Sequence, residues 1–159
     1  MISLDDYFYY VDDAMEGMIA IVTDLGDEAA NATLDVAGSN SPYAILTHCL
    51  GVMEFWGGHA IAGRVIERDR AAEFVAMGPV DELVARARAA LRQLRSDTEG
   101  LEPGSPPRGQ LGGKDKERPY GQTQGGTLFH IYEELAQHRG QMEVTRDILK
   151  AGGASRVQH

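Results

Sequence analysis

Four stretches of this chain carry apolar residues at the spacing of a helix, and segments rich in glycine, proline or charge separate them. The first stretch, residues 4–25, repeats apolar side chains every three or four positions, with acidic residues between them. The others lie at about 42–57, 79–98 and 127–150. Because no strand pattern or internal repeat interrupts them, the spacing predicts an all-α fold, a four-helix bundle with long connections.

Local signals indicate where these helices begin and end. Ser3 is placed to cap the start of the first helix, and the acidic residues that follow suit the positive end of the helix dipole. Gly26 is a plausible end for the same helix. Pro42, preceded by a serine, stands where a helix commonly has its first residue, so we expect the second helix to begin there.

The connections between the helices are long. Residues 64–73 are mostly charged and predict a solvated connection, with a helical turn at about 71–76. Residues 99–124 hold several prolines and many glycines, which predicts a long loop. At 159 residues the chain has the size of one domain, so we expect a single domain over 1–159 that ends in a flexible tail at about 151–159.

Charge and cysteine content limit the partners of the chain. Fifteen basic and 24 acidic residues leave a formal net charge of −9, and an acidic surface repels the phosphate backbone of nucleic acids. No apolar run approaches the roughly 20 residues that span a bilayer, and the N-terminus lacks the basic start of a signal peptide. We therefore expect a cytoplasmic monomer or homodimer with no nucleic-acid or membrane partner. Cys49 is the only cysteine, so any metal must be held by nitrogen and oxygen ligands.

Three polar side chains recur every four residues in the last predicted helix: His130, Glu134 and His138. They lie about one turn apart on one face. Two such groups can reach a single ion, because their Cβ atoms are about 5–6 Å apart. His48, in the apolar middle of the second helix, is the candidate for a third ligand. The alternative is that Glu134 and His138 form an exposed ion pair and that His48 is a hydrogen-bonded core residue.

Three separated segments resemble one protein family. The His-Arg-Gly-Gln run at 138–141 resembles the end of the last helix of the DinB superfamily. Residues 47–56 and 68–74 look like the branch of that superfamily related to mycothiol-dependent maleylpyruvate isomerase and the mycothiol S-transferases. The resemblance implies a DinB/YfiT-like four-helix bundle, in agreement with the periodicity.

The resemblance also implies a site. One divalent metal ion would be held by His48, Glu134 and His138. Many DinB-like proteins have a histidine where Glu134 stands, whereas the isomerase-like branch uses a His, Glu, His set. Two imidazoles and one carboxylate suit zinc, our first choice, and also nickel, iron or manganese. His130, one turn before Glu134, is the candidate catalytic residue, placed to orient a ligand, contact substrate or replace Glu134.

Further residues are candidates for binding substrate. They are Trp56, Arg139 and, from the long loop, Tyr120. Trp56 is also explained as a core residue, and Arg139 as a member of a surface ion pair. Cys49 points about 100° away from His48 on a helix, so we expect a buried, inert thiol.

The expected function is that of a metal-dependent transferase or isomerase with a low-molecular-weight, mycothiol-like thiol as co-substrate and an electrophile as substrate. A free thiol ionises near pH ~8.5, and coordination to a divalent cation deprotonates it at neutral pH. Two alternatives stand beside it. One is a metal-dependent hydrolase with His130 or Glu54 as proton carrier. The other is a non-catalytic, stress-related metal-binding protein.

Overall fold

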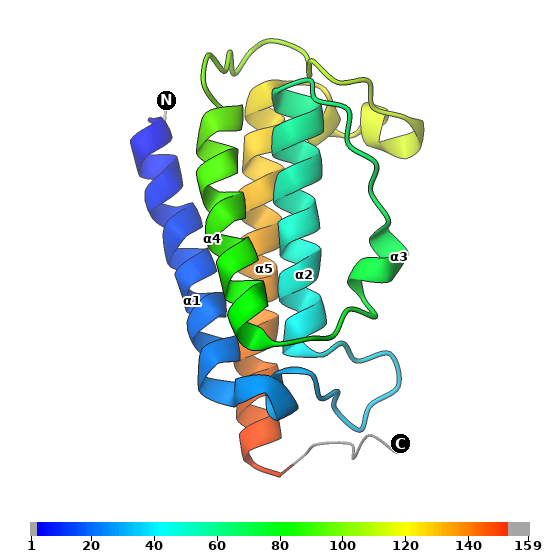
Figure 1. Cartoon of the computed structure of the whole chain (residues 1–159). Coiled ribbons are helices and arrows are strands. Elements are labelled where there is room, and N and C mark those ends of the chain that lie inside the picture. Colours follow the sequence, from blue (N-terminus) through cyan, green and yellow to red (C-terminus); the bar gives the residue numbers. More distant parts are fainter. Residues whose placement is uncertain (1–2, 153–159) are drawn as a thin grey trace.

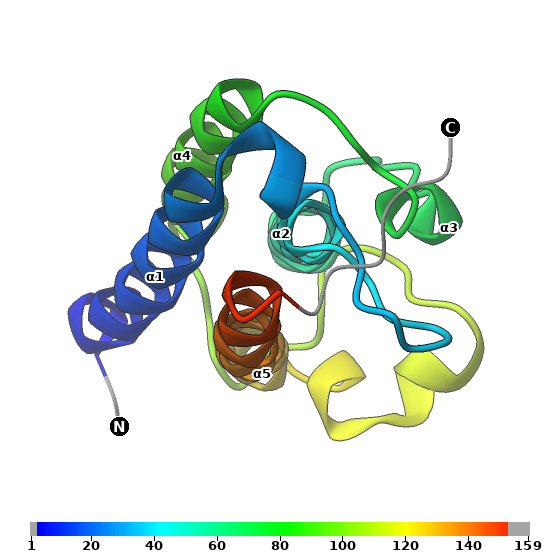
Figure 2. The ribbon, with the colours of Figure 1, turned by 90° about the horizontal axis from the view of Figure 1, so that it is seen from below.

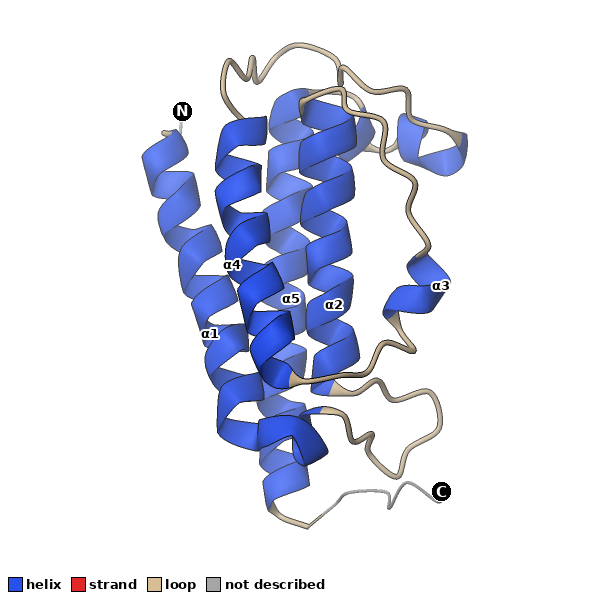
Figure 3. Cartoon of the chain, in the orientation of Figure 1, coloured by secondary structure: helices blue, strands red, loops and turns tan. Residues whose placement is uncertain are grey.

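A computed structural model describes residues 3–152 of the chain and shows four long helices packed side by side (Figure 1). The long elements are α1 (Leu4–Ala30), α2 (Pro42–Val52) with its continuation η1 (Met53–Ile61), α4 (Val80–Asp97) and α5 (Gln124–Lys150). A short helix, α3 (Arg70–Glu73), lies outside them, and the described residues contain no strand (Figure 3). The predicted all-α fold is confirmed.

The four long helices enclose one apolar core. Helix α1 packs against α4 and α5, and α2 also packs against α4 and α5. Seen along the helix axes, α3 and the loop that follows α4 lie on the outer side of α2 and α5, away from α1 (Figure 2). Burying one large apolar side chain contributes about 1.5–3 kcal/mol. Fully buried side chains include Met15, Met18, Ile45, Leu46, Met53, Leu83, Leu94, Ile131, Leu135 and Met142.

The predicted helix caps are present. Ser3 Oγ accepts a hydrogen bond from the backbone N–H of Asp6 at 3.0 Å, and the Asp6 carboxylate accepts one from the Ser3 N–H at 3.3 Å. Ser41 caps α2 through its hydroxyl, directly before the proline. Gly26 has a φ of 68°, a conformation that glycine adopts without strain, and it interrupts α1 where the sequence predicted an end. One more turn, to Ala30, follows the kink.

The second helix does not stop at its glycine pair, and it continues as the π-helix η1. A side chain at Gly57 would place its Cβ 2.5 Å from Leu94 Cδ1, and one at Gly58 would place it 2.3 Å from Arg64 Nη2. Gly57 therefore lets Leu94 of α4 pack close to the backbone of η1, and Gly58 does the same for the side chain of Arg64. π-Helical segments are rare and often lie at functional sites.

The connections are more ordered than the sequence predicted. The prediction that residues 64–73 form a solvated connection is wrong for Arg68 and Glu73, because Glu73 is buried and Arg68 is paired with it. The long loop after α4 contains two 3-10 turns, η2 (Gly113–Glu117) and η3 (Pro119–Gly121). The side chain of Gln124 holds the loop, since its amide donates to Pro106 O at 3.0 Å.

Two further predictions concern the C-terminal tail and the absence of a membrane-spanning helix. The predicted flexible tail lies outside the described residues from residue 153 onward. Among residues 3–152, no helix combines the length and the apolar character that crossing a bilayer requires.

Candidate metal centre

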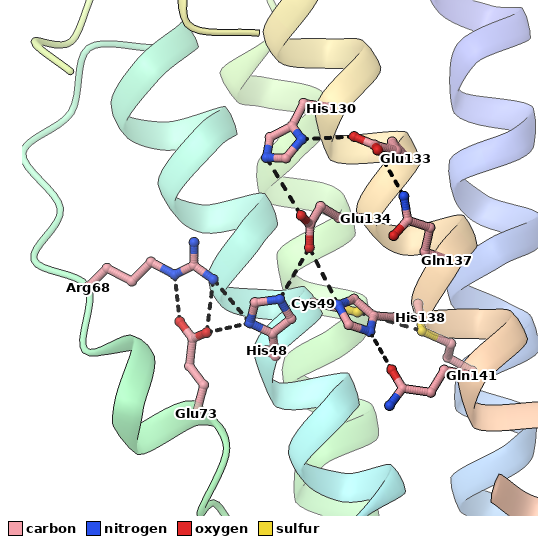
Figure 4. A network of polar contacts seen from close by, with 11 residues as sticks. His48, Cys49, Arg68, Glu73, His130, Glu133, Glu134, Gln137, His138 and Gln141 are labelled. Carbon is pink, nitrogen blue, oxygen red and sulfur yellow. Dashed lines mark hydrogen bonds and ion pairs between the residues drawn. The ribbon is translucent and has the colours of Figure 1, made fainter. Parts of the chain in front are cut away.

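The three side chains predicted to share an ion meet between α2 and α5 (Figure 4). His48 Nε2 lies 3.3 Å from Glu134 Oε2, and His138 Nε2 lies 3.4 Å from the same oxygen. One potential ligand atom from each residue lies within 4.8 Å of the other two. Glu134 and His138 are one turn apart on α5, and α2 packs against that helix, so the bundle itself brings the three together.

Hydrogen bonds on the outer side of both imidazoles define their tautomers. His48 Nδ1 lies 2.8 Å from Glu73 Oε2, and His138 Nδ1 lies 2.9 Å from the amide oxygen of Gln141. An ionised carboxylate and an amide oxygen only accept hydrogen bonds, so each Nδ1 carries the proton and donates it. Each Nε2 therefore turns a lone pair toward Glu134.

Three acceptor atoms that converge in this way require a cation between them. In the metal-free protein the hydrogen bond with Glu134 raises the pKa of His138, which favours a proton there, and the same bond holds the pKa of Glu134 well below its usual range. Two imidazole nitrogens and one carboxylate oxygen also form the donor set of a divalent metal site that keeps a position open for substrate. The residues present fit such an ion.

An arginine–glutamate pair supports His48 from behind. Arg68 donates from Nε to Glu73 Oε1 at 2.6 Å and from Nη2 to Glu73 Oε2 at 2.9 Å. Arg68 Nη2 also lies 3.3 Å from His48 Nδ1. A protonated Nδ1 cannot accept from a guanidinium, and its contact with Glu73 is shorter, so we assign the His48 hydrogen bond to the carboxylate. Phe74 stacks on the His48 ring, with centroids 4.6 Å apart.

A pocket opens beside this cluster, lined by residues that include His48, Glu134, His130, Trp56 and Tyr120. The His130 ring stacks on Tyr120 at 4.0 Å and meets the edge of Trp56 at 5.1 Å. His130 Nε2 lies 3.8 Å from Glu134 Oε1, the carboxylate oxygen that the other two histidines do not contact. The structure thus places His130 next to the cluster, on the wall of the pocket.

Other candidate residues lie elsewhere. Arg139 is not brought to the pocket: its guanidinium contacts Asp13 of α1 and donates to Glu143 at 3.1 Å, the surface ion pair that the sequence left open. Glu54 is exposed and lines a different groove. Cys49 is fully buried, as expected, and burial raises the pKa of its thiol.

Sequence reasoning missed the residues that orient the histidines. Gln141 stands three positions after His138, so helical spacing alone places the two on one face. Glu73 and Arg68 carry no periodic signal, because they belong to a connection and a four-residue helix. Only the resemblance of residues 68–74 to a known family singled out that segment.

The fold and the site together define an all-α protein with a His, Glu, His cluster that could hold a divalent metal ion beside a pocket. A family model described as mycothiol-S-transferase matches residues 7–151, nearly the whole chain. The chain belongs to the mycothiol-S-transferase family. A search of curated protein sequences gives no match.

Proposed function

We propose that the protein is a metal-dependent transferase or isomerase that joins a mycothiol-like thiol to an electrophilic substrate in the cytoplasm. The observation that carries this proposal is the convergence of two imidazole lone pairs and a carboxylate at a pocket, in a chain of the mycothiol-S-transferase family. His48, Glu134 and His138 would hold the ion, with zinc as the first choice. All three belong to one chain, so the site is complete in a monomer and in a homodimer.

The reacting sulfur must come from a small molecule. The bound ion would lower the pKa of a coordinated thiol and so supply a thiolate at neutral pH. The protein itself offers no such sulfur, because Cys49 is fully buried and its pKa is raised. A thiol cofactor entering the pocket is therefore the source that this architecture suits.

His130 is the residue that we propose to move the proton. Its Nδ1 lies 3.1 Å from a Glu133 carboxylate oxygen and donates to it, which leaves the lone pair of Nε2 available on the pocket side. His130 would take the proton of the thiol, and the sulfur would form a bond to the electrophilic carbon. In a substitution the bond from that carbon to the leaving group would break, and the leaving group would take the electron pair and the proton. In an addition the π bond of the electrophile would open, and the resulting carbanion would take the proton. Trp56 and Tyr120 form the aromatic wall that keeps water from the reacting atoms.

The test is thiol consumption by protein loaded with a defined metal. Zinc-loaded protein is incubated with mycothiol, bacillithiol or glutathione and a panel of electrophiles, and loss of free thiol and formation of the conjugate are followed. We expect turnover with mycothiol that disappears in His138→Ala. If no thiol is consumed with any electrophile, the transferase proposal fails.

Two control arms identify the alternatives. The same protein without added thiol, given ester, amide and epoxide substrates, reports metal-dependent hydrolysis, which His130 would also serve as a proton carrier. Small-molecule binding that survives in metal-free His138→Ala would favour a non-catalytic binding protein. His59→Ala is the matched control, because both ring nitrogens of His59 contact backbone oxygens of loops and not the cluster.

A further inference from the structure

The carboxylate of Glu73 is held in one position by three contacts. It accepts two hydrogen bonds from Arg68 and one from His48 Nδ1, and the residue is only 8% exposed. Removing a carboxylate from water is unfavourable unless partners compensate for the lost hydration. Arg68 alone would satisfy its charge, so the hydrogen bond to His48 is an additional feature of this pair.

The backbone of α2 makes room for this carboxylate. A Cβ at Gly51 would lie 2.1 Å from Glu73 Oε1 and 2.7 Å from its carboxyl carbon. Gly51 is three residues after His48, so the two lie on the same face of α2. A glycine inside a helix is less stable than an alanine, and here it lets the carboxylate approach the imidazole.

We propose that Glu73, clamped by Arg68, is a positioning residue for the metal centre. It holds His48 in the Nδ1–H tautomer and fixes the ring so that the Nε2 lone pair points at Glu134. This inference rests on the proposed metal site and adds to it a determinant of metal affinity outside the ligand set. Outer hydrogen-bond partners of metal-binding histidines are worth roughly 10–100-fold in affinity.

The chain contains its own control for the loss of a buried ion pair. Arg64 donates to Asp97 from Nε at 3.1 Å and from Nη2 at 2.7 Å, and Asp97 is 5% exposed. No histidine contacts that carboxylate within the described residues; its third partner is the side chain of Gln93. Asp97→Asn therefore removes the same kind of pair without touching the cluster.

Two measurements on purified variants test the proposal. The first is the affinity for Zn²⁺ and Co²⁺ by competition with a chelator, together with the visible spectrum of the Co²⁺ form. The second is ¹⁵N NMR of the imidazoles in metal-free protein, which reports the His48 tautomer without any metal. We expect Glu73→Gln to lower affinity roughly tenfold or more and to reduce the Nδ1–H form, and Gly51→Ala to act in the same direction.

The outcomes separate the inference from the proposed function. Wild-type protein that binds neither ion overturns the metal site itself, and the NMR measurement then still decides the role of Glu73 in orienting His48. Unchanged affinity and tautomer in Glu73→Gln overturn the inference, as does an equal affinity loss in Asp97→Asn. If Glu73→Gln does not fold, Glu73→Asp keeps the charge and withdraws the oxygens by one methylene, and it is expected to show the same loss.

Discussion

The connection between η1 and α4 contains two arginines that form similar pairs with carboxylates, one with Asp97 of α4 and one with Glu73 within the connection itself. Arg64 with Asp97 and Arg68 with Glu73 are both two-pronged, and both carboxylates are buried. Both also rely on a glycine of the second helix for space, Gly58 beside the guanidinium of Arg64 and Gly51 beside the carboxylate of Glu73. The pairs differ in the third partner of the carboxylate.

That third partner separates a structural role from a functional one. Asp97 accepts from Gln93 of its own helix, so its hydrogen bonds end within the scaffold. Glu73 accepts from His48, and through that ring it reaches the oxygen that His138 also faces. A buried ion pair is weak evidence for stability by itself. The role of such a pair therefore depends on which group donates the third hydrogen bond to its carboxylate.

The largest expected effect comes from removing a ligand on the functional side. We predict that His48→Ala, Glu134→Ala and His138→Ala each lower zinc affinity by more than the roughly 100-fold that an outer partner is worth. Elemental analysis of protein purified without a metal-affinity step measures this, with circular dichroism to show that helical content is kept. Retention of stoichiometric zinc in any one variant would remove that residue from the ligand set.

The next largest effect is expected on the structural side, and on stability alone. Asp97→Asn should lower the free energy of unfolding by about 2 kcal/mol, between the ~0–1 of exposed pairs and the ~3–5 of fully buried ones, because the Arg64 side chain is 41% exposed. Urea unfolding of the metal-free protein gives the value. Zinc affinity should stay within about twofold of wild type, and a larger change would mean that the two pairs are not independent.

The four-helix architecture was predictable from the sequence, and so was the identity of the cluster, for different reasons. The caps and the repeating apolar positions predict where the helices begin and end. Glu134 and His138 could be paired because they are four residues apart on one helix. His48 was a candidate because it is a histidine in the apolar middle of the second helix, and the family resemblance then placed it in the ligand set. Glu73 was beyond sequence reasoning, because its partner is distant in the chain and its neighbours predict a solvated segment. The π-helix was missed because glycines signal helix ends more often than close packing.

A change of pH distinguishes the two sides, because only one side carries histidines, for which a proton and a metal ion would compete. The pKa of Glu134 is lowered and that of His138 is raised in the metal-free protein. The stability from Glu134 is present above its unfolded pKa and is lost as the pH falls through the folded value. The stability from His138 is present below its unfolded pKa of about 6.5 and is lost as the pH rises through the folded value.

Metal-free protein should therefore be most stable between about pH 4.5 and 6.5. Zinc affinity should instead decrease as the pH is lowered through that range, by about tenfold per pH unit for each proton that the ion displaces. Thermal unfolding of the metal-free protein and chelator competition, both from pH 5 to about 8, follow the two curves. In His138→Ala the acid optimum of stability should be lost. Parallel curves for stability and zinc affinity would contradict the exchange of proton for metal.

The smallest expected effect lies between a ligand and the residue that orients it. Gly140 is exposed on α5 between His138 and Gln141, and a Cβ there would meet no atom within 4 Å. Unlike Gly51 and Gly58, it makes room for nothing, so Gly140→Ala should raise the free energy of unfolding by about 0.5–1 kcal/mol through helix propensity alone. Zinc affinity should not change, because the hydrogen bond from His138 Nδ1 to Gln141 is formed by the neighbouring side chains. If Gly140→Ala lowered zinc affinity, the effect of Gly51→Ala could no longer be attributed to the close approach of Glu73 to Gly51.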